Sequence, residues 1–211
     1  MLRALAGTGI SVTVTVAKKS LHNALSLANL TAVQLSTPHS LGILASSEPP
    51  SATLFCRGYD KAIFAPILDF HRRTKSPFMV NPYPFFGFDP TRPESLNYAL
   101  FKPNGGVWDA ATSVNYTNMF DAQMDPWPEW SPVAEPNESG VSFDNTVSYS
   151  GNLMKHLNSG KGTPLMPNRI FETFIFSLFN ENLQPIVCER NYGLFNPDLT
   201  TVYHLHVFIE R

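Results

Sequence analysis

The sequence predicts an α/β fold in which apolar strands and amphipathic helices alternate along a chain of 211 residues. Residues 174–179 (FIFSLF) form an apolar run of strand length, which ends abruptly at the polar residues 180–182 (NEN). Residues 143–157 instead carry apolar side chains at helical spacing and stop at residues 158–160 (NSG). Alternating strands and helices form a parallel sheet, and the functional residues of such folds follow the strands. We therefore expect a site near residues 180–182.

Three further strands are expected. Residues 10–16 (ISVTVTV) alternate apolar and hydroxyl side chains and give the clearest strand pattern of the chain. This alternation is typical of a half-exposed strand, although in a closed sheet the threonines would face a polar interior layer. Shorter apolar runs predict the other two strands at residues 33–36 and 78–81.

Two helices are expected besides residues 143–157. Residues 20–29 bring leucines and alanines onto one face, which predicts a short amphipathic helix. Residues 60–73 predict a longer helix, whose last turn carries His-Arg-Arg at the negative end of the helix dipole. Pro66 either bends this helix or marks its first firm turn.

The composition favours a neutral ligand. Charged residues make up 15% of the chain, compared with about 25% in an average globular domain. The formal net charge is −2 and there is no basic block, which disfavours nucleic acid and anionic membranes as partners. No run approaches the roughly 18 apolar residues of a transmembrane helix. The low charge and 12% of aromatic residues suit an oligosaccharide, and the sequence leaves the oligomeric state open.

The signals for cellular location conflict. Residues 1–7 are too short and become polar too soon for a secretory signal peptide. Three triplets nevertheless match the acceptor pattern for N-linked glycosylation, beginning at Asn29, Asn115 and Asn137. They hint at a secreted ancestry, although such triplets also arise by chance.

No cofactor or metal is expected. His39 has no companion at metal-ligand spacing, and we interpret it as a structural hydrogen-bonding residue. The sequence contains no glycine-rich loop of the phosphate-binding kind and no Ser-His-Asp arrangement.

Five motifs resemble one family closely. They are residues 80–86 (VNPYPFF), 120–123 (FDAQ), 160–165 (GKGTPL), 180–182 (NEN) and 189–195 (ERNYGLF). Together they resemble the plant endo-β-1,3-glucanases, which form glycoside hydrolase family seventeen. The resemblance implies a (β/α)8 barrel that hydrolyses internal O-glycosidic bonds of cell-wall β-1,3-glucan by a retaining mechanism. It also implies an extracellular or cell-wall location.

The family pattern predicts an incomplete barrel here. The predicted strands resemble the third, fifth, sixth and eighth strands of the family, whereas a closed barrel needs eight strands and about 250 residues. We expect a single glycoside-hydrolase-like domain over residues 1–211, shortened at its amino terminus. Apparent internal deletions lie near residues 17–20 and 125–138.

No catalytic residue can be assigned from the resemblance. The family acid lies in a Gly-Asn-Glu turn, but the Asn-Glu pairs at residues 137–138 and 180–181 lack the glycine. The family nucleophile is a glutamate three residues before a tryptophan, and no tryptophan of this chain has a carboxylate there. Glu129 and Glu135 lie in a proline-rich stretch that cannot fix a carboxylate against a partner, so we interpret them as solvated loop acids.

Substrate-binding residues are better retained. Aromatic rings and amides suit sugar rings and hydroxyls, although phenylalanines of residues 80–86 also fit an ordinary core. In the family, the glutamates of residues 180–182 and 189–195 support the catalytic carboxylates, but Gln184 replaces a frequent lysine. The expected substrate-binding residues are Asn81, Tyr83, Phe86, Glu181, Asn182 and Glu189.

Three interpretations remain open at this point. The chain is a β-1,3-glucan hydrolase by descent, a non-catalytic relative that still binds β-glucan, or a mis-spliced product without a stable fold. The loss of both catalytic motifs makes hydrolysis by this chain doubtful.

Overall fold

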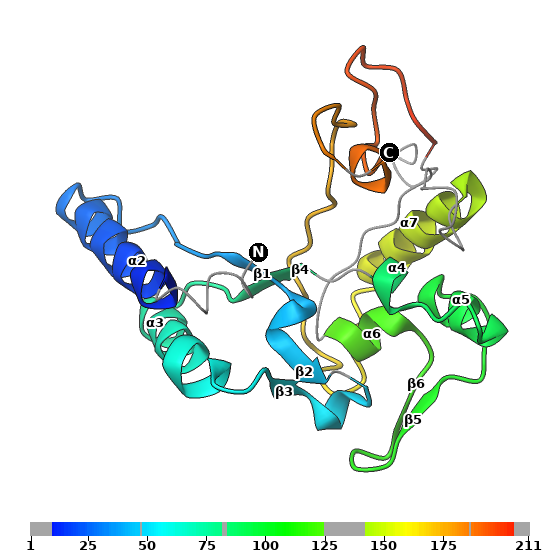
Figure 1. The fold of residues 1–211 in the computed structure, drawn as a ribbon, viewed down its shortest axis with the longest axis horizontal. Helices are drawn as coiled ribbons and strands as arrows, with labels where there is room; N and C mark the ends of the chain where they lie inside the picture. The colour runs from blue at the N-terminus through cyan, green and yellow to red at the C-terminus, as the bar shows by residue number, and fades with distance from the viewer. Residues whose placement is uncertain (1–9, 47, 82–83, 125–141, 186, 205–211) are drawn as a thin grey trace. The chain divides into compact units, whose positions relative to one another are not determined.

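Figure 1 shows the computed structural model, which describes residues 10–46, 48–81, 84–124, 142–185 and 187–204. The chain divides into two compact units, Met1–Asn81 and Pro82–Arg211. The expectation of a single domain over residues 1–211 stays a prediction. Among the described helices, none is both long enough and apolar enough to cross a membrane.

The first unit contains a short parallel strand pair. β1 (Pro38–Ser40) lies beside β4 (Met79–Asn81), and the helix α3 (Ala65–Thr74) is part of the crossover between them. This arrangement is the strand–helix–strand unit that the alternating pattern predicts. The other elements are α2 (Ile10–Leu27), η1 (Leu41–Ile43), β2 (Leu44–Ser46), η2 (Pro50–Ala52), β3 (Leu54–Phe55) and the π-helical η3 (Asp60–Phe64), with β2 and β3 antiparallel.

Two predicted elements of this unit are confirmed. η3 and α3 together cover the helix predicted over residues 60–73, and β4 lies within the strand predicted over residues 78–81. Pro66 stands in the first turn of α3, directly after the π-helical turn of η3. The helix ends at Lys75, whose φ of 57° is left-handed and turns the chain toward β4.

The strand predicted over residues 10–16 is wrong, because these residues form the first turns of α2. The helix predicted over residues 20–29 is the second part of the same element. A strand needs a neighbour to satisfy its backbone N–H and C=O groups, and no described strand pairs with residues 10–16. A helix satisfies those groups within the segment itself.

The strand predicted over residues 33–36 is also wrong, since β1 begins only at Pro38. Side chains hold this segment instead. Gln34 Nε2 donates to the Lys75 carbonyl at 3.0 Å, and Ser36 Oγ donates to the Pro77 carbonyl at 2.7 Å. The segment therefore runs beside the chain that enters β4 without forming a backbone ladder.

The second unit surrounds a core of aromatic and aliphatic side chains. Its elements are α4 (Pro84–Gly87), α5 (Pro93–Ala99), β5 (Val107–Asp109), β6 (Val114–Tyr116), α6 (Met119–Met124), α7 (Phe143–Asn158) and η4 (Cys188–Arg190). α7 confirms the helix predicted over residues 143–157. Ser142 begins it by accepting a hydrogen bond from the Asn145 backbone N–H, and its Leu153 belongs to the same buried core as Phe120 of α6.

The strand predicted over residues 174–179 is wrong as well. The solvent exposure of the side chains still alternates along the segment, as in a half-buried strand. Among the described residues, however, only Phe179 of this segment forms a β-bridge, which is parallel and pairs it with Phe195. Phe174 is 63% exposed and Leu178 is 57% exposed. The segment is extended, but no described strand runs beside it along its whole length. It therefore has the side-chain pattern of a strand without continuous backbone hydrogen bonding to a neighbour.

His39 of β1 is buried among aromatic rings of the first unit. Its ring stacks on Phe78 at 5.0 Å and meets Phe64 edge-on at 5.2 Å, and its side chain is 1% exposed. Neither ring nitrogen has a hydrogen-bond partner among the described residues, so its interpretation as a hydrogen-bonding residue is wrong. Burial, then the charges of Lys18 and His71, lower the pKa of His39 from 6.5 to about 4.

Acid should destabilise the first unit through His39. Between pH 6.5 and about 4 the unfolded chain binds a proton that the folded chain excludes, so the free energy of unfolding falls as the pH falls. The full loss, reached below pH 4, is roughly 3 kcal/mol. His39→Phe should remove most of this pH dependence in urea unfolding curves recorded from pH 4 to 8. The exposed His204→Asn is the matched control, and an unchanged pH profile in His39→Phe would contradict the account.

Candidate functional site

Residues 177–196, which we call the Glu181 loop, carry half of the expected substrate-binding residues. Backbone bonds fold its two ends together: the Phe195 N–H donates to the Leu178 carbonyl at 3.0 Å, and the Asn180 N–H donates to the Phe195 carbonyl at 2.8 Å. The Leu194 N–H donates to the Ser177 carbonyl at 3.0 Å. The apolar run therefore ends in a loop that closes on itself.

Asn180 fixes this closure with its side chain. Its Oδ1 accepts the Gly193 N–H at 2.9 Å, and its Nδ2 donates to Asn196 Oδ1 at 3.2 Å. Glycine is required at position 193, because a Cβ there would collide with the backbone of Phe179 and Asn180. The side chain of Asn180 is thus used to build the loop.

Glu181 follows directly and is half-buried. Its N–H donates to the Arg190 carbonyl at 3.0 Å, and its Oε2 accepts from Gln184 Nε2 at 2.7 Å. The Arg190 guanidinium is directed elsewhere, since its Nε donates to the Gln184 carbonyl. The partner of the Glu181 carboxylate is therefore a neutral amide at the position where the family often has a lysine.

The loop brings together three of the expected substrate-binding residues. Glu181, the exposed Asn182 and the half-buried Glu189 of η4 lie within it, and the bond from Glu181 to Arg190 joins the segments that carry them. Asn81 is exposed at the carboxyl end of β4 and belongs to the first unit. Tyr83 lies outside the described residues, and Phe86 is described only as part of the backbone of α4.

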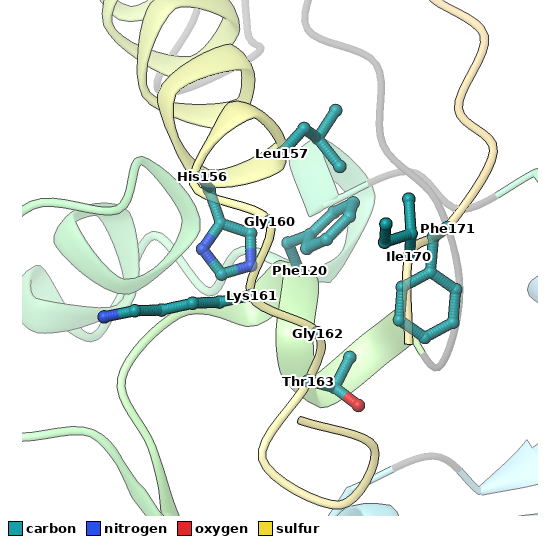
Figure 2. Close-up of a pocket in the computed structure, with 9 residues that line it drawn as sticks. All are labelled: Phe120, His156, Leu157, Gly160, Lys161, Gly162, Thr163, Ile170 and Phe171. Carbon is teal, nitrogen blue, oxygen red and sulfur yellow. The ribbon is translucent and has the colours of Figure 1, made fainter. Parts of the chain in front are cut away.

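A second polar cluster, which the sequence reasoning missed, joins α6 to α7. His156 Nε2 lies 2.9 Å from Asp121 Oδ1, and Asn118 Nδ2 donates to Asp121 Oδ2 at 2.8 Å. His156 and Asp121 are 35 residues apart, so local patterns give no signal, although Asp121 belongs to the FDAQ motif. Figure 2 shows His156 beside Phe120, both lining a cavity of about 20 Å³. That volume suits a water molecule and is too small for a pyranose ring.

Several aspartates serve as local structural acceptors. Hydrogen bonds from Thr91 lower the pKa of Asp89, and hydrogen bonds from Thr200 lower the pKa of Asp198. Arg72 lowers the pKa of Asp69 through a side-chain hydrogen bond. These carboxyl groups stay ionised near neutral pH and are therefore unsuited to act as general acids. Across the described ranges, no cluster of three or more His, Cys, Asp or Glu side chains could hold a metal ion.

Comparison with known proteins identifies the family. The model of glycosyl hydrolases family 17 matches residues 4–129 and 127–207. The chain belongs to glycosyl hydrolase family 17. A glucan endo-1,3-β-glucosidase of Triticum aestivum is 46% identical over 218 residues, covering 94% of this chain and 47% of the relative. Glucan endo-1,3-β-glucosidase 11 of Arabidopsis thaliana is 40% identical, covering 96% of this chain and 53% of the relative.

Solved structures agree with this assignment. CJP38, a β-1,3-glucanase and allergen of Cryptomeria japonica pollen, matches with a TM-score of 0.81 and 36% identity, over 90% of this chain and 64% of that protein. A plant β-glucan endohydrolase matches with a TM-score of 0.80 and 30% identity, over 94% of this chain and 68% of that protein. The resemblance to plant β-1,3-glucanases is confirmed, as is a mixed α/β structure. The family 17 chain spans about half the length of the curated relatives it matches.

Gly193→Ala should open the Glu181 loop. The added methyl group would collide with the backbone of residues 179–180, and overpacking of this kind costs about 1–3 kcal/mol. Gly151→Ala in α7 is the matched control, since no atom lies within 4 Å of its added Cβ. That change should stabilise the helix by about 0.5–1 kcal/mol. Thermal unfolding of both variants measures the difference, and equal shifts would count against the close packing at Gly193.

Proposed function

We propose that this chain binds β-1,3-glucan without hydrolysing it. Family membership supports the ligand, because the relatives are named as glucan endo-1,3-β-glucosidases. The observation that carries the proposal is the intact Glu181 loop, in which Glu181, Asn182 and Glu189 are held within one hydrogen-bonded turn system. The family's catalytic motifs are absent from the sequence, whereas these supporting residues are present.

The chemistry of the loop suits a neutral sugar. Carboxylate and amide oxygens accept hydrogen bonds from hydroxyl groups, and the Asn182 amide also donates. The exposed ring of Phe176, 48% accessible, precedes the loop and offers an apolar face to the C–H groups of a pyranose. Asn81 and Tyr83 are proposed as further sugar contacts on the strength of the residue 80–86 motif.

Hydrolysis needs more than these residues provide. A retaining glycosidase places two carboxyl groups about 5–5.5 Å apart, one as nucleophile and one as acid and base. Glu181 is held by a neutral amide. Asp89 and Asp198 are held ionised by hydrogen bonds within their own turns, and Asp69 is held ionised by Arg72. We therefore assign no catalytic residue to this chain.

The fold is proposed to be an incomplete (β/α)8 barrel wall. On this interpretation, residues 33–36 and 78–81 correspond to the fifth and sixth family strands, which are neighbours in a barrel. The parallel pairing of β4 with β1, which begins two residues after residue 36, supports this interpretation. Residues 10–16 and 174–179 correspond to the third and eighth strands, whose barrel neighbours the sequence lacks. An extracellular or cell-wall location is proposed from the same family relationship.

The proposal is tested with the full chain and laminarin, a soluble β-1,3-glucan. We expect saturable binding by calorimetry, a cooperative melt that laminarin shifts upward, and no release of reducing ends. Glu181→Gln should weaken binding about tenfold or more, because a charged hydrogen-bond acceptor is lost. The exposed Glu94→Gln is the matched control and should bind normally.

Three results would contradict this function. Release of reducing ends that Glu181→Gln abolishes would favour the second candidate, hydrolysis of internal β-1,3 bonds, which the 46% identity to a named glucosidase supports. A cooperative melt without laminarin binding would exclude glucan as the ligand. The absence of any cooperative melt would favour the mis-spliced product.

A further inference from the structure

The β5–β6 hairpin of the second unit has one buried face and one exposed face. The strands are antiparallel, with Val107 opposite Tyr116, Trp108 opposite Asn115 and Asp109 opposite Val114. Asp109 and Tyr116 are fully buried, so their face packs inward. Trp108 and Asn115 point the other way and form an exposed cross-strand pair.

Trp108 is an uncommonly exposed tryptophan. Its side chain is 60% accessible, although indole rings normally bury most of their apolar surface. Directly opposed residues of an antiparallel pair have Cβ atoms about 4.5–5.5 Å apart. A group attached to the Asn115 side chain therefore starts next to the indole ring.

Asn115 begins the glycosylation triplet Asn115-Tyr116-Thr117, and both Asn115 and Thr117 are exposed. Asn115 Nδ2 donates one hydrogen bond to the Gly105 carbonyl at 3.1 Å. A primary amide has two N–H groups, so one is free for substitution while the other keeps this bond. Gly106, with a φ of 75°, lets the Asn115 side chain approach closely, because a Cβ there would contact it at 2.5 Å.

We propose that Asn115 carries an N-linked glycan whose first N-acetylglucosamine lies against Trp108. In the transfer step, a bond forms between sugar C1 and Asn115 Nδ2 while the C1–oxygen bond of a polyprenyl diphosphate donor breaks. The diphosphate leaves with the electron pair, and the amide nitrogen loses one proton to a base. The apolar face of the sugar then covers indole surface that water otherwise contacts.

Asn29 is the internal comparison. It also begins an exposed triplet, but it follows α2 with a left-handed φ of 58° and has no cross-strand partner. A glycan there would have no opposed aromatic ring to cover. The third triplet, which begins at Asn137, lies outside the described residues.

The test directs the full chain into the secretory pathway of plant cells with an added leader. An amidase first releases the glycans and converts each modified asparagine to aspartate. Peptide mass spectrometry then shows which of the acceptor asparagines were glycosylated. Chain is recovered from endoplasmic reticulum membranes as well as from the medium. We expect Asn115 to be modified in the wild type and unmodified in Thr117→Ala, which leaves the asparagine in place.

Hydroxyl-radical oxidation measures the contact with the indole ring. We expect Trp108 to oxidise several-fold more slowly in glycosylated chain than in Thr117→Ala, while the exposed Phe174 oxidises equally in both. An unmodified Asn115 in the recovered wild-type chain would overturn the proposed site. Equal oxidation of Trp108 with and without the glycan would overturn the packing of the sugar on the ring.

Discussion

Backbone pairing is the constraint on which this structure depends. A β-strand leaves its N–H and C=O groups unsatisfied unless a neighbouring strand accepts them, whereas a helix satisfies them internally. In the first unit, β1 and β4 satisfy part of that need in parallel, and α3 closes the crossover between them. Ile63, Phe64 and Ile67 of η3 and α3 then form the core of that unit. Residues 10–16 have no such partner among the described strands and are helical instead.

The same constraint shapes the candidate site. Residues 174–179 keep the alternating exposure of a strand. Within the described ranges, their backbone is hydrogen-bonded where the chain returns at residues 192–195. Asn180 completes that closure with its side chain, and Gly193 permits the close approach. Glu181 is consequently held on a self-closed loop with Gln184 as its partner. A loop of this kind can present hydrogen-bonding groups to a sugar without a neighbouring strand. A pair of catalytic carboxylates needs paired strands that fix the distance between the two carboxyl groups.

The sequence predicted the elements that depend on interactions within a single segment. The helices at residues 60–73 and 143–157 were predictable because their apolar spacing, prolines and terminal residues act within one segment. Residues 10–16 carry a strong strand pattern, yet strand formation depends on a neighbour that no local pattern reveals. The Glu181 loop was predictable as a motif, whereas the partners that Asn180 binds, Gly193 and Asn196, lie 13 and 16 residues away and leave no local signal. The Asp121–His156 pair was missed because it joins side chains distant in sequence.

Amide hydrogen exchange of the full chain tests the central role of strand pairing most directly. The account predicts measurable protection at alternate residues of β4, whose N–H groups face β1, and at Asn180 and Phe195 where the loop closes. It predicts near-intrinsic exchange at residues 174–176, which have the sequence of a strand without its ladder. Strong protection across residues 174–176, equal to that of β4, would show a paired strand there and would contradict the account.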